Sequence, residues 1–354
     1  MNTDVWTTGL RISVDWIAFT VQEESYGVLG IMDWLGFSPL SFSTALRGAF
    51  GYKSLVNLDG YSLSILSDGN ADMGIHVNIS GSAVAHVLDS YARRHSVATP
   101  FGTEAFEVSD FHQTVLSQFL RDIHLIGQLS RLDIAIDDFD DHFKIADLEH
   151  FLASGQVVSK FRSYTNNIKR SVSTNELEGG TIYFGSGSSD VRLRVYDKQL
   201  EHNTKHPDDL VKNPWVRWEF QLRNERADAF SALLTHKNYP LGQAAVSVLN
   251  NYIRIINLDD SNRSRCSVSE AWEKFVGAVN RLKLYVHSVP KTLDDKRNWI
   301  IEQVLPTLTG IIIADGGMFD IITEHWDSSC ARMKSDLLQL LHDVDINQAT
   351  ARVR

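Results

Sequence analysis

Residues 180–198, GTIYFGSGSSDVRLRVYDK, decide the fold, because two alternating segments flank a turn rich in glycine and serine. Successive side chains of a β-strand point to opposite faces, so residues two apart share a face. The apolar positions after the turn are Val191, Leu193 and Val195. The opposite face of the same segment carries Arg192, Arg194 and Tyr196. This stretch predicts an antiparallel hairpin with one apolar face and one chemically active face.

Two further stretches, SRLDIAIDD at 130–138 and WVRWEFQLR at 215–223, show the same alternation of apolar and charged residues. The charged residues on their polar faces are Arg131, Asp133, Asp137, Arg217, Glu219 and Arg223. An ordinary half-exposed sheet carries a more varied polar face. We therefore expect these strands to share one antiparallel sheet, whose polar face combines carboxylates, guanidinium groups and a phenol.

That combination favours phosphodiester chemistry. Carboxylates can hold a hard divalent cation, and guanidinium groups match phosphate oxygens. The predicted ligands are Asp133, Asp137 and Glu219, and the predicted ion is Mg²⁺ or Mn²⁺, because these strands contain no Cys or His. The two aspartates could instead be solvated strand-end residues, and Glu219 could be a cross-strand ion-pair member between Arg217 and Arg223.

Tyr196 is the candidate nucleophile. A phenol has an ordinary pKa near ~10, so attack near neutral pH requires a neighbouring cation or base. Arg192 and Arg194 lie on the predicted face to act as catalytic partners. Tyr183, in the same hairpin, precedes the turn and lacks flanking arginines, so we expect it to pack.

These segments carry a resemblance to a known family. The hairpin through Glu201, the strands RLDIAIDD and WVRWEFQLR, and the earlier VDWIAFTV from Val14 and MGIHVNISGSAV from Met73 resemble the Rep_trans family. That family comprises rolling-circle replication initiators of plasmids and related relaxases of integrative conjugative elements. The resemblance implies that Tyr196 nicks one DNA strand, becomes joined to the 5′ phosphate and leaves a free 3′ hydroxyl, an outcome similar to that of type I topoisomerases.

The resemblance also implies partners: single-stranded or cruciform origin DNA, a host DNA helicase and a second copy in a homodimer. A conjugative relaxase that nicks a transfer origin is an alternative with the same chemistry. A non-catalytic DNA-binding protein of the same fold is a second alternative. A hydrolytic metal nuclease, in which Asp133, Asp137 and Glu219 activate water, is a third.

The expected fold class is α+β, and we expect three regions. Residues 1–105 form a β-rich N-terminal region, and residues 106–235 form the antiparallel-sheet domain that carries the site. Residues 236–354 form a helical C-terminal region, because segments such as SEAWEKFVGAVNRLKLYVH and MKSDLLQLLHDVD are amphipathic at helical spacing. Origin specificity and helicase contacts are not located residue by residue within this last region.

A formal net charge of −10 over 354 residues disfavours long-range attraction to DNA, so binding must be local. The expected DNA-binding residues are Lys160, Arg162, Lys169, Arg170, Lys198 and Arg217. The first four bracket SYTNN, where Phe161 and Tyr164 could stack on bases. An ordinary solvated loop is the alternative for that segment.

The cysteine count and the N-terminus bound the cellular setting. Only two cysteines, Cys266 and Cys330, are present, which argues against a disulfide framework. The N-terminal residues lack a basic segment followed by an apolar core, and no apolar run is long enough to span a bilayer. We therefore expect a cytoplasmic protein without membrane association.

Overall fold

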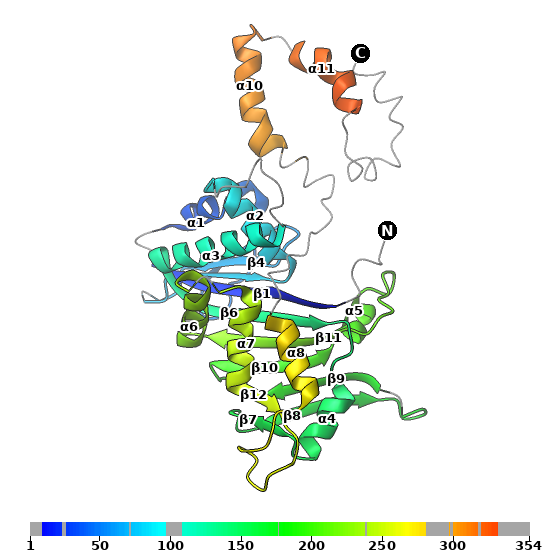
Figure 1. Ribbon diagram of the computed structural model, residues 1–354. Helices are drawn as coiled ribbons and strands as arrows, with labels where there is room; N and C mark the ends of the chain where they lie inside the picture. Colours follow the sequence, from blue (N-terminus) through cyan, green and yellow to red (C-terminus); the bar gives the residue numbers. More distant parts are fainter. Residues whose placement is uncertain are drawn as a thin grey trace. The chain divides into compact units, whose positions relative to one another are not determined.

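The computed structural model describes residues 9–22, 26–70, 72–96, 108–175, 177–237, 239–280, 297, 300–317 and 320–331. Residues 1–287 form one compact unit, and residues 288–354 form a second. The first unit is built on a sheet of ten strands in the order β2-β3-β4-β5-β1-β6-β11-β10-β9-β8 (Figure 1). All described pairings in this sheet are antiparallel, which confirms the α+β class.

The strands of this sheet are β1 (Leu10–Val21), β2 (Phe42–Thr44), β3 (Ser54–Leu58), β4 (Leu63–Ser67), β5 (Ile75–Ser80), β6 (Gly127–Asp138), β8 (Tyr164–Arg170), β9 (Leu177–Phe184), β10 (Val191–Asp197) and β11 (Val216–Arg223). A second, two-stranded sheet pairs β7 (Val157–Ser159) with β12 (Ile253–Ile255). The three stretches that predicted strands therefore are β6, the β9–β10 hairpin and β11.

The helices of the first unit are α1 (Val28–Trp34), α2 (Ser82–Arg94), α3 (Val108–Ile126), α4 (Ile145–Ala153), α5 (Lys198–Lys205), α6 (Glu225–Thr235), α7 (Leu241–Tyr252) and α8 (Glu270–Asn280), together with the short 3-10 helix η2 (Pro39–Ser41). Figure 1 shows α6, α7 and α8 lying across the strands. The segment MKSDLLQLLHDVD, which the sequence predicts as a helix, lies outside the described residues.

One face of the ten-stranded sheet is apolar and is covered by helices. Trp218 of β11 is fully buried there, and its ring centroid lies 5.2 Å from that of Phe275 in α8 and 6.0 Å from that of Phe143. In the N-terminal half, Phe19 of β1 packs against Phe119 of α3. Burial of each such side chain stabilises the folded state by about 1.5–3 kcal/mol. The alternation predicted for each strand therefore determines which face of the sheet packs against the helices.

The single sheet joins the two regions that the sequence divides near residue 105. Strand β1 pairs with β5 on one side and with β6 on the other, so the N-terminal strands and the site strands share one ladder. The residues around 235, the second expected boundary, also lie within the first compact unit. The three expected regions therefore describe the sequence only. In the structure, the strands of residues 1–105 and of residues 106–235 belong to one sheet.

The second unit is helical over its described residues: η3 (Ile300–Val304, a π-helical segment), α10 (Leu305–Ala314) and α11 (Asp320–Ala331). Pro306 lies in the first turn of α10, where its missing N–H does not interrupt helical hydrogen bonds. Gly316 and Gly317 follow the helix with φ values of 75° and 86°. This is a common way to end a helix.

Candidate active site

The nucleophile candidate is fixed by strand register. Tyr196 of β10 lies opposite Arg217 of β11 and opposite Thr181 of β9. Two residues earlier, Arg194 lies opposite Glu219 of β11. Directly paired residues of an antiparallel ladder project from the same face, so the sheet brings the phenol, both guanidinium groups and the carboxylate together on its polar face.

The hydroxyl of Tyr196 donates a hydrogen bond of 3.3 Å to Oε2 of Glu219. The guanidinium carbon of Arg194 lies 5.3 Å from the centroid of the Tyr196 ring, and Nζ of Lys198 lies 5.7 Å from it. The phenol is therefore bordered by one carboxylate and by cations on strands β10 and β11 and at the start of α5.

Burial raises the pKa of Tyr196 above its ordinary value. The charge of Arg217 acts in the opposite direction, the charge of Glu219 raises this pKa further, and Arg194 lowers it. The balance keeps the phenol protonated near neutral pH. Any attack by this oxygen therefore requires that its proton be transferred to an acceptor.

Glu219 is placed to be that acceptor. Only 1% of its side chain is exposed, and it forms an ion pair with Arg194. Burial raises the pKa of Glu219, and the nearby charge of Asp15 raises it further, whereas Arg194 and Arg217 lower it. A carboxylate with a raised pKa is a stronger base than an ordinary glutamate.

Arg217 is held in the sheet by two aspartates. Its Nε and Nη2 donate to the two carboxylate oxygens of Asp137 at 2.6 and 2.9 Å, and Nη1 donates to Asp15 at 3.0 Å. The indole N–H of Trp215 also donates to Asp137, at 2.6 Å. Asp137 is thus already occupied by its neighbours, and the Arg217 side chain is only 11% exposed, with its guanidinium group paired to Asp137 and Asp15.

Sequence reasoning missed Asp15. This residue lies at an irregularity of β1, between Val14, which pairs with Ile134, and Trp16, which pairs with Asp133. A β-bulge redirects one side chain relative to the regular alternation. The acid in VDWIAFTV was visible as a charge within an apolar strand, but its contact with Arg217 depends on the bulge.

Asp133 lies farther along the polar face and has its own arginine. Arg131 donates to both of its carboxylate oxygens, at 2.9 and 2.6 Å, and stacks over the Trp16 ring at 3.9 Å. Burial raises the pKa of Asp133 to about 6, against the lowering effect of Arg131. The register places Asp133 opposite Gln221, whereas Tyr196 lies opposite Arg217, four residues away along β11.

The predicted metal ligands Asp133, Asp137 and Glu219 are therefore each paired with a different arginine. In the described residues no group of three or more His, Cys, Asp or Glu side chains is placed to hold a metal ion. These three acids do not fit a shared metal centre in this arrangement. Glu219 is the carboxylate that contacts Tyr196, and Asp15 is its acidic neighbour.

Arg192 shares the polar face with Tyr196 but does not contact it. Its guanidinium carbon lies 4.3 Å from the centroid of the Tyr183 ring. Tyr196 lies four positions after Arg192 on β10, a distance of about 13 Å along a strand. The predicted catalytic pair is thus divided, with Arg194 beside the phenol and Arg192 over the other tyrosine of the hairpin.

The basic segment before the hairpin includes the edge strand β8. Lys169 pairs with Glu178 at 3.0 Å, Arg170 pairs with Glu149 at 3.8 Å, and Lys160 donates to Asn251. Arg162 is exposed. Lys198, nearer the site, pairs with Glu201 at 2.6 Å.

The two aromatic residues of this segment lie on the helix-covered side of the sheet. Phe161 is half-buried and packs against Phe184 and Tyr252. Tyr164 lies opposite Phe184 in the ladder, on the face away from Tyr196. The polar positions of β8 on the Tyr196 face are Thr165, Asn167 and Lys169.

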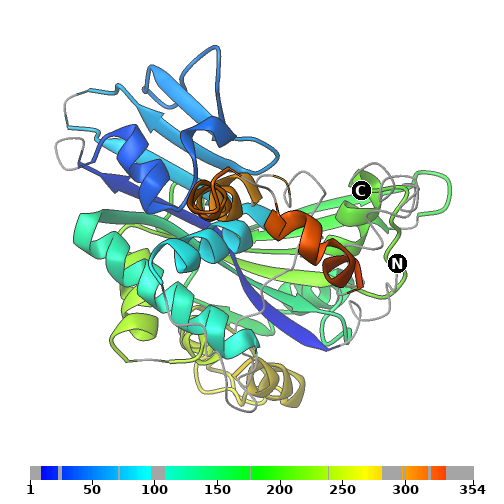
Figure 2. The same ribbon diagram turned by 90° about the horizontal axis from the view of Figure 1, so that it is seen from above.

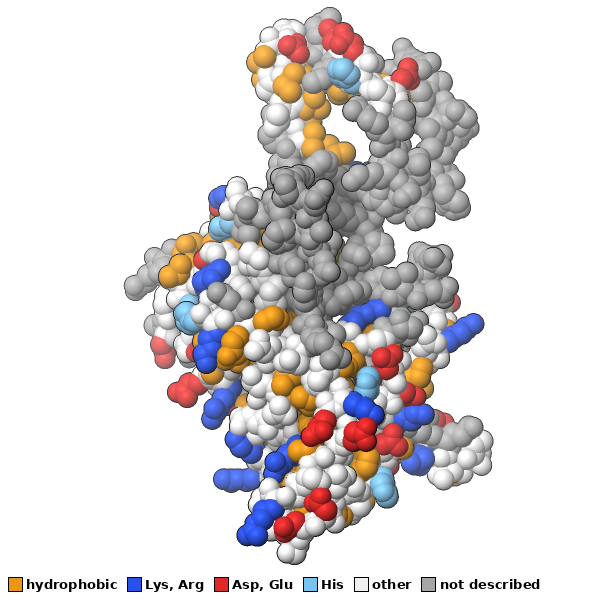
Figure 3. Space-filling view, viewed as in Figure 1, with side chains coloured by type: hydrophobic (Ala, Val, Ile, Leu, Met, Phe, Trp, Pro, Cys, Tyr) orange, Lys and Arg blue, Asp and Glu red, His pale blue; other side chains and the backbone are white. Residues whose placement is uncertain are grey.

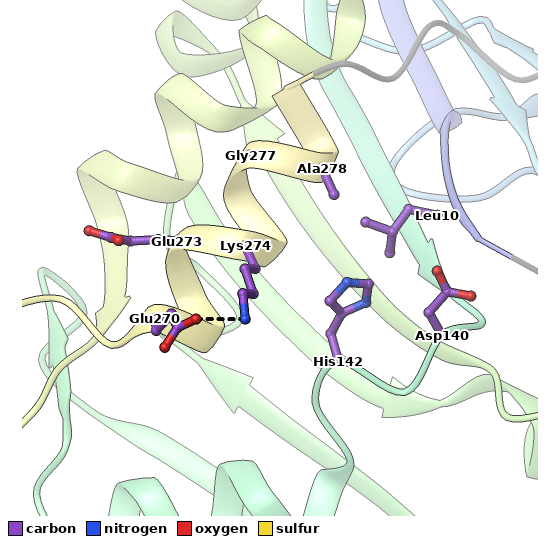
Figure 4. Close-up of a pocket in the computed structure, with 8 residues that line it drawn as sticks. All are labelled: Leu10, Asp140, His142, Glu270, Glu273, Lys274, Gly277 and Ala278. Carbon is purple, nitrogen blue, oxygen red and sulfur yellow. Dashed lines mark ion pairs between the residues drawn. The ribbon is translucent and has the colours of Figure 1, made fainter.

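A pocket of about 740 Å³ lies on the helical side, lined by Leu10, Asp140, His142, Glu270, Glu273, Lys274, Gly277 and Ala278 (Figure 4). His142 is anchored there by a 3.0 Å contact between its Nδ1 and the buried Asp138. Figure 3 shows acidic and basic side chains interspersed over this side of the molecule. The pocket contains none of the residues around Tyr196, so we do not assign it to the strand chemistry.

Comparison with known proteins matches the same strands. The profile of the replication initiation factor family, Rep_trans, matches residues 127–325, more than half of the chain. The chain belongs to this family. The match begins at β6 and includes β10 and β11, so the Rep_trans assignment covers Tyr196, Glu219 and both of their arginines.

Two relatives agree with the Rep_trans assignment. A Bacillus subtilis (strain 168) protein named as the DNA relaxase NicK is 35% identical over 192 residues, which is 53% of this chain and 54% of that protein. The chain thus matches about half the length of this relative. A solved structure of a rolling circle replication initiator protein from Geobacillus stearothermophilus is 27% identical, with a TM-score of 0.63, and covers 79% of this chain and 100% of its own.

Among the residues whose structure is described, no helix combines the length and the apolar character that crossing a bilayer requires.

Proposed function

We propose that this protein is a DNA strand transferase that nicks one strand of an origin and thereby initiates rolling-circle replication. The observation that carries the proposal is the hydrogen bond from the Tyr196 hydroxyl to Glu219, with Arg194 paired to the same carboxylate. The names of the related initiator and relaxase support this choice of substrate. Origin DNA in single-stranded or cruciform form is the proposed partner.

The proposed reaction is a transesterification. The Tyr196 oxygen attacks the scissile phosphorus while its proton moves to Glu219, and a bond from tyrosine oxygen to phosphorus forms. The bond from phosphorus to the 3′ oxygen breaks, and that oxygen takes up a proton and leaves as a free hydroxyl. The 5′ phosphate remains on the protein, so the energy of the phosphodiester is kept for later rejoining.

The cations around the phenol would act on the developing charge. Arg194 borders the phenol ring, and Arg217 lies opposite Tyr196 in the ladder. Fixed guanidinium groups near a phosphate stabilise the extra negative charge of a pentacoordinate transition state. Because Arg217 is held by Asp137 and Asp15, we propose that it contributes through its fixed position and charge.

A divalent cation, Mg²⁺ or Mn²⁺, remains part of the proposal in a narrower form. If bound, it would supply charge neutralisation at the phosphate. We assign it no ligand, because Glu219 serves as the proton acceptor and Asp133, Asp137 and Glu219 each pair with an arginine. The reaction steps above use only the side chains of this chain.

The test is covalent adduct formation. Purified protein is incubated, with and without Mg²⁺ or Mn²⁺, with single-stranded oligonucleotides that tile its own genetic element, and products are resolved on a denaturing gel. We expect a 5′-linked adduct with the wild type and none with Tyr196→Phe. Tyr183→Phe, which alters the other tyrosine on the same hairpin face, is the matched control and should retain the adduct.

Other outcomes separate the alternatives. Cleavage that survives Tyr196→Phe without an adduct would support the hydrolytic nuclease. Binding without cleavage across the tiling would support the non-catalytic binder. The relative named as a relaxase favours a conjugative relaxase as the second candidate. A nick that maps to a transfer origin rather than to a replication origin would select it. The host helicase, the homodimer and cytoplasmic localisation remain predictions.

A further inference from the structure

A hairpin loop in the N-terminal half displays apolar side chains that the fold does not use. The loop comprises residues 45–53, between β2 and β3. Its Leu46 is 103% exposed and its Phe50 is 84% exposed. A fully exposed leucine and phenylalanine on one short loop contribute little to folding, because they leave their apolar surface in water.

The backbone at Phe50 makes its presence more unusual. Phe50 has a φ of 54° and Gly51 a φ of 89°, and the N–H of Tyr52 closes the turn on the carbonyl of Ala49 at 2.9 Å. Turns with two positive φ values favour Asn, Asp or Gly, and a bulky side chain in this region is strained. The turn therefore holds the Phe50 ring in solvent in a strained backbone conformation, and a ring this exposed gains too little packing to offset the strain.

The loop lies on the polar face of the sheet. The Tyr52 ring stacks on the His76 ring with centroids 6.3 Å apart, and its hydroxyl donates to the carbonyl of Met73 at 3.0 Å. His76 lies opposite Thr20 of β1 and contacts its hydroxyl at 2.9 Å. Thr20 shares its strand face with Trp16, over which Arg131 stacks.

That face continues to the candidate nucleophile. Trp16 lies opposite Asp133, Asp133 lies opposite Gln221, and Gln221 lies opposite Arg192 on the Tyr196 strand. Six strand steps separate β3 from β10 in the sheet. At ~4.8 Å per step this is about 29 Å across the strands. The loop and Tyr196 also lie at opposite ends of the strands, because Thr20, opposite His76, is far along β1 from Arg11, which lies opposite Asp137. Figure 2 shows the two groups of strands, blue and green, apart within the same sheet.

The loop also departs from the charge of the whole chain. Residues 34–58 contain Arg47 and Lys53 but no Asp or Glu, although the chain carries 44 acids. Both basic residues are exposed. Among the described residues neither forms an ion pair with an acid. Along this loop the two basic residues alternate with the two exposed apolar residues, in the order Leu46, Arg47, Phe50 and Lys53.

We propose that loop 45–53 is a wedge for duplex DNA that extends across the polar face of the sheet from the nick site. Phe50 and Leu46 would insert at a base step, and Arg47 and Lys53 would contact the adjoining phosphates. Inserted apolar side chains unstack and kink a duplex in many architectural proteins. The inference rests on the proposed function only for the source of the DNA.

The experiment uses full-length Tyr196→Phe protein, so that binding is measured without cleavage. The probe is a mixed-sequence stem–loop oligonucleotide with 2-aminopurine beside a central TA step, because such steps are easily unstacked. We expect the protein to raise the 2-aminopurine fluorescence. Phe50→Gly should abolish this rise and weaken duplex binding about tenfold. Leu40→Ala is the matched control, because Leu40 is 94% exposed but lies outside the loop.

Two further measurements keep the result interpretable. Arg47→Gln with Lys53→Gln should reduce the slope of log affinity against log salt by about 2. Equal binding and equal fluorescence by Phe50→Gly would overturn the wedge. An equal loss of affinity for the unpaired strand of the same sequence would also overturn it, and would assign the loop to single-strand stacking instead.

Failure of the wedge is distinguishable from failure of the proposed function. With Tyr196 intact, Phe50→Gly should form the covalent adduct on single-stranded oligonucleotides at the wild-type rate while its duplex binding falls. If the wild type forms no adduct, the proposed function fails, but the stem–loop measurement still decides the wedge.

Discussion

The Tyr196 hydroxyl donates a 3.3 Å hydrogen bond to Glu219, directly across from the position that Arg194 occupies in the same ladder. Burial raises the pKa of both groups that this contact joins, the Tyr196 phenol and the Glu219 carboxylate. The two groups therefore form a proton donor and acceptor pair within one sheet face. The candidate chemistry depends on this pair more than on any shared cluster of acids.

Replacement of Glu219 by Gln removes the acceptor while keeping its size. We expect adduct formation to slow by about 10²- to 10⁴-fold, the usual contribution of a general base. The measurement is the single-turnover rate of adduct formation on a saturating oligonucleotide. Glu178→Gln, at an exposed acid that pairs with Lys169, is the control and should leave this rate unchanged. A wild-type rate in Glu219→Gln would remove Glu219 from the mechanism.

The rate should also depend on pH through the same carboxylate. Glu219 accepts a proton only when it is ionised, and its pKa in the folded protein is raised by burial and by Asp15. The rate should therefore fall as pH is lowered through this raised pKa, above the range of an ordinary glutamate. A rate profile that is flat across pH 5 to 8, at saturating DNA, would contradict this role.

Asp133 should make stability depend on pH. Its pKa is about 6 in the fold against an ordinary 3.8, mainly because of burial. The folded state thus binds this proton more tightly than the unfolded state. Its contribution to stability is present below the unfolded pKa and is lost as pH rises from about 4 to about 6, on the order of 3 kcal/mol.

Denaturant unfolding at a series of pH values measures this effect. Asp133→Asn should lack this component of the pH dependence, although it is destabilised at all pH values because Arg131 loses its partner. If wild type and Asp133→Asn change in parallel between pH 4 and pH 6, the assignment to Asp133 is refuted.

The turn at Phe50 offers a substitution that should stabilise the protein. Phe50→Gly relieves a positive φ and removes almost no packing, so we expect the free energy of unfolding to rise by about 0.5–1 kcal/mol. Leu40→Gly, at an equally exposed site with helical backbone, should lower it by about 0.5–1 kcal/mol. Chemical denaturation compares the two, and a loss in both variants would refute the strain at Phe50.

The apolar face of the sheet should be sensitive to truncation. Phe275 of α8 is fully buried against Trp218, Phe143 and Trp272. Phe275→Ala should lower the free energy of unfolding by about 3–5 kcal/mol. Glu273→Ala, at an exposed position of the same helix, should change it by less than about 0.5 kcal/mol. Similar losses in both variants would contradict a specific contribution of the Phe275 contacts.

Alternation in the sequence was enough to place Arg194, Tyr196 and Glu219 on one face. Strands β10 and β11 are neighbours in the sheet, and the apolar residues of each strand indicate which of its faces packs against the helices. The hairpin turn and the strand β6 follow from the same local signals. The family resemblance then singles out Tyr196 over Tyr183, whose ring lies under Arg192.

The α+β class, the site strands and the residues of the polar face therefore follow from the sequence alone, because a period of two residues is a local property of the chain. The pairing of each acid with its arginine follows from tertiary contacts. Asp137 lies with Arg217, Asp133 lies with Arg131, and Glu219 alone lies against Tyr196. Those pairings depend on strand order and on the bulge at Asp15, which arise from contacts between segments far apart in sequence and leave no periodic signal.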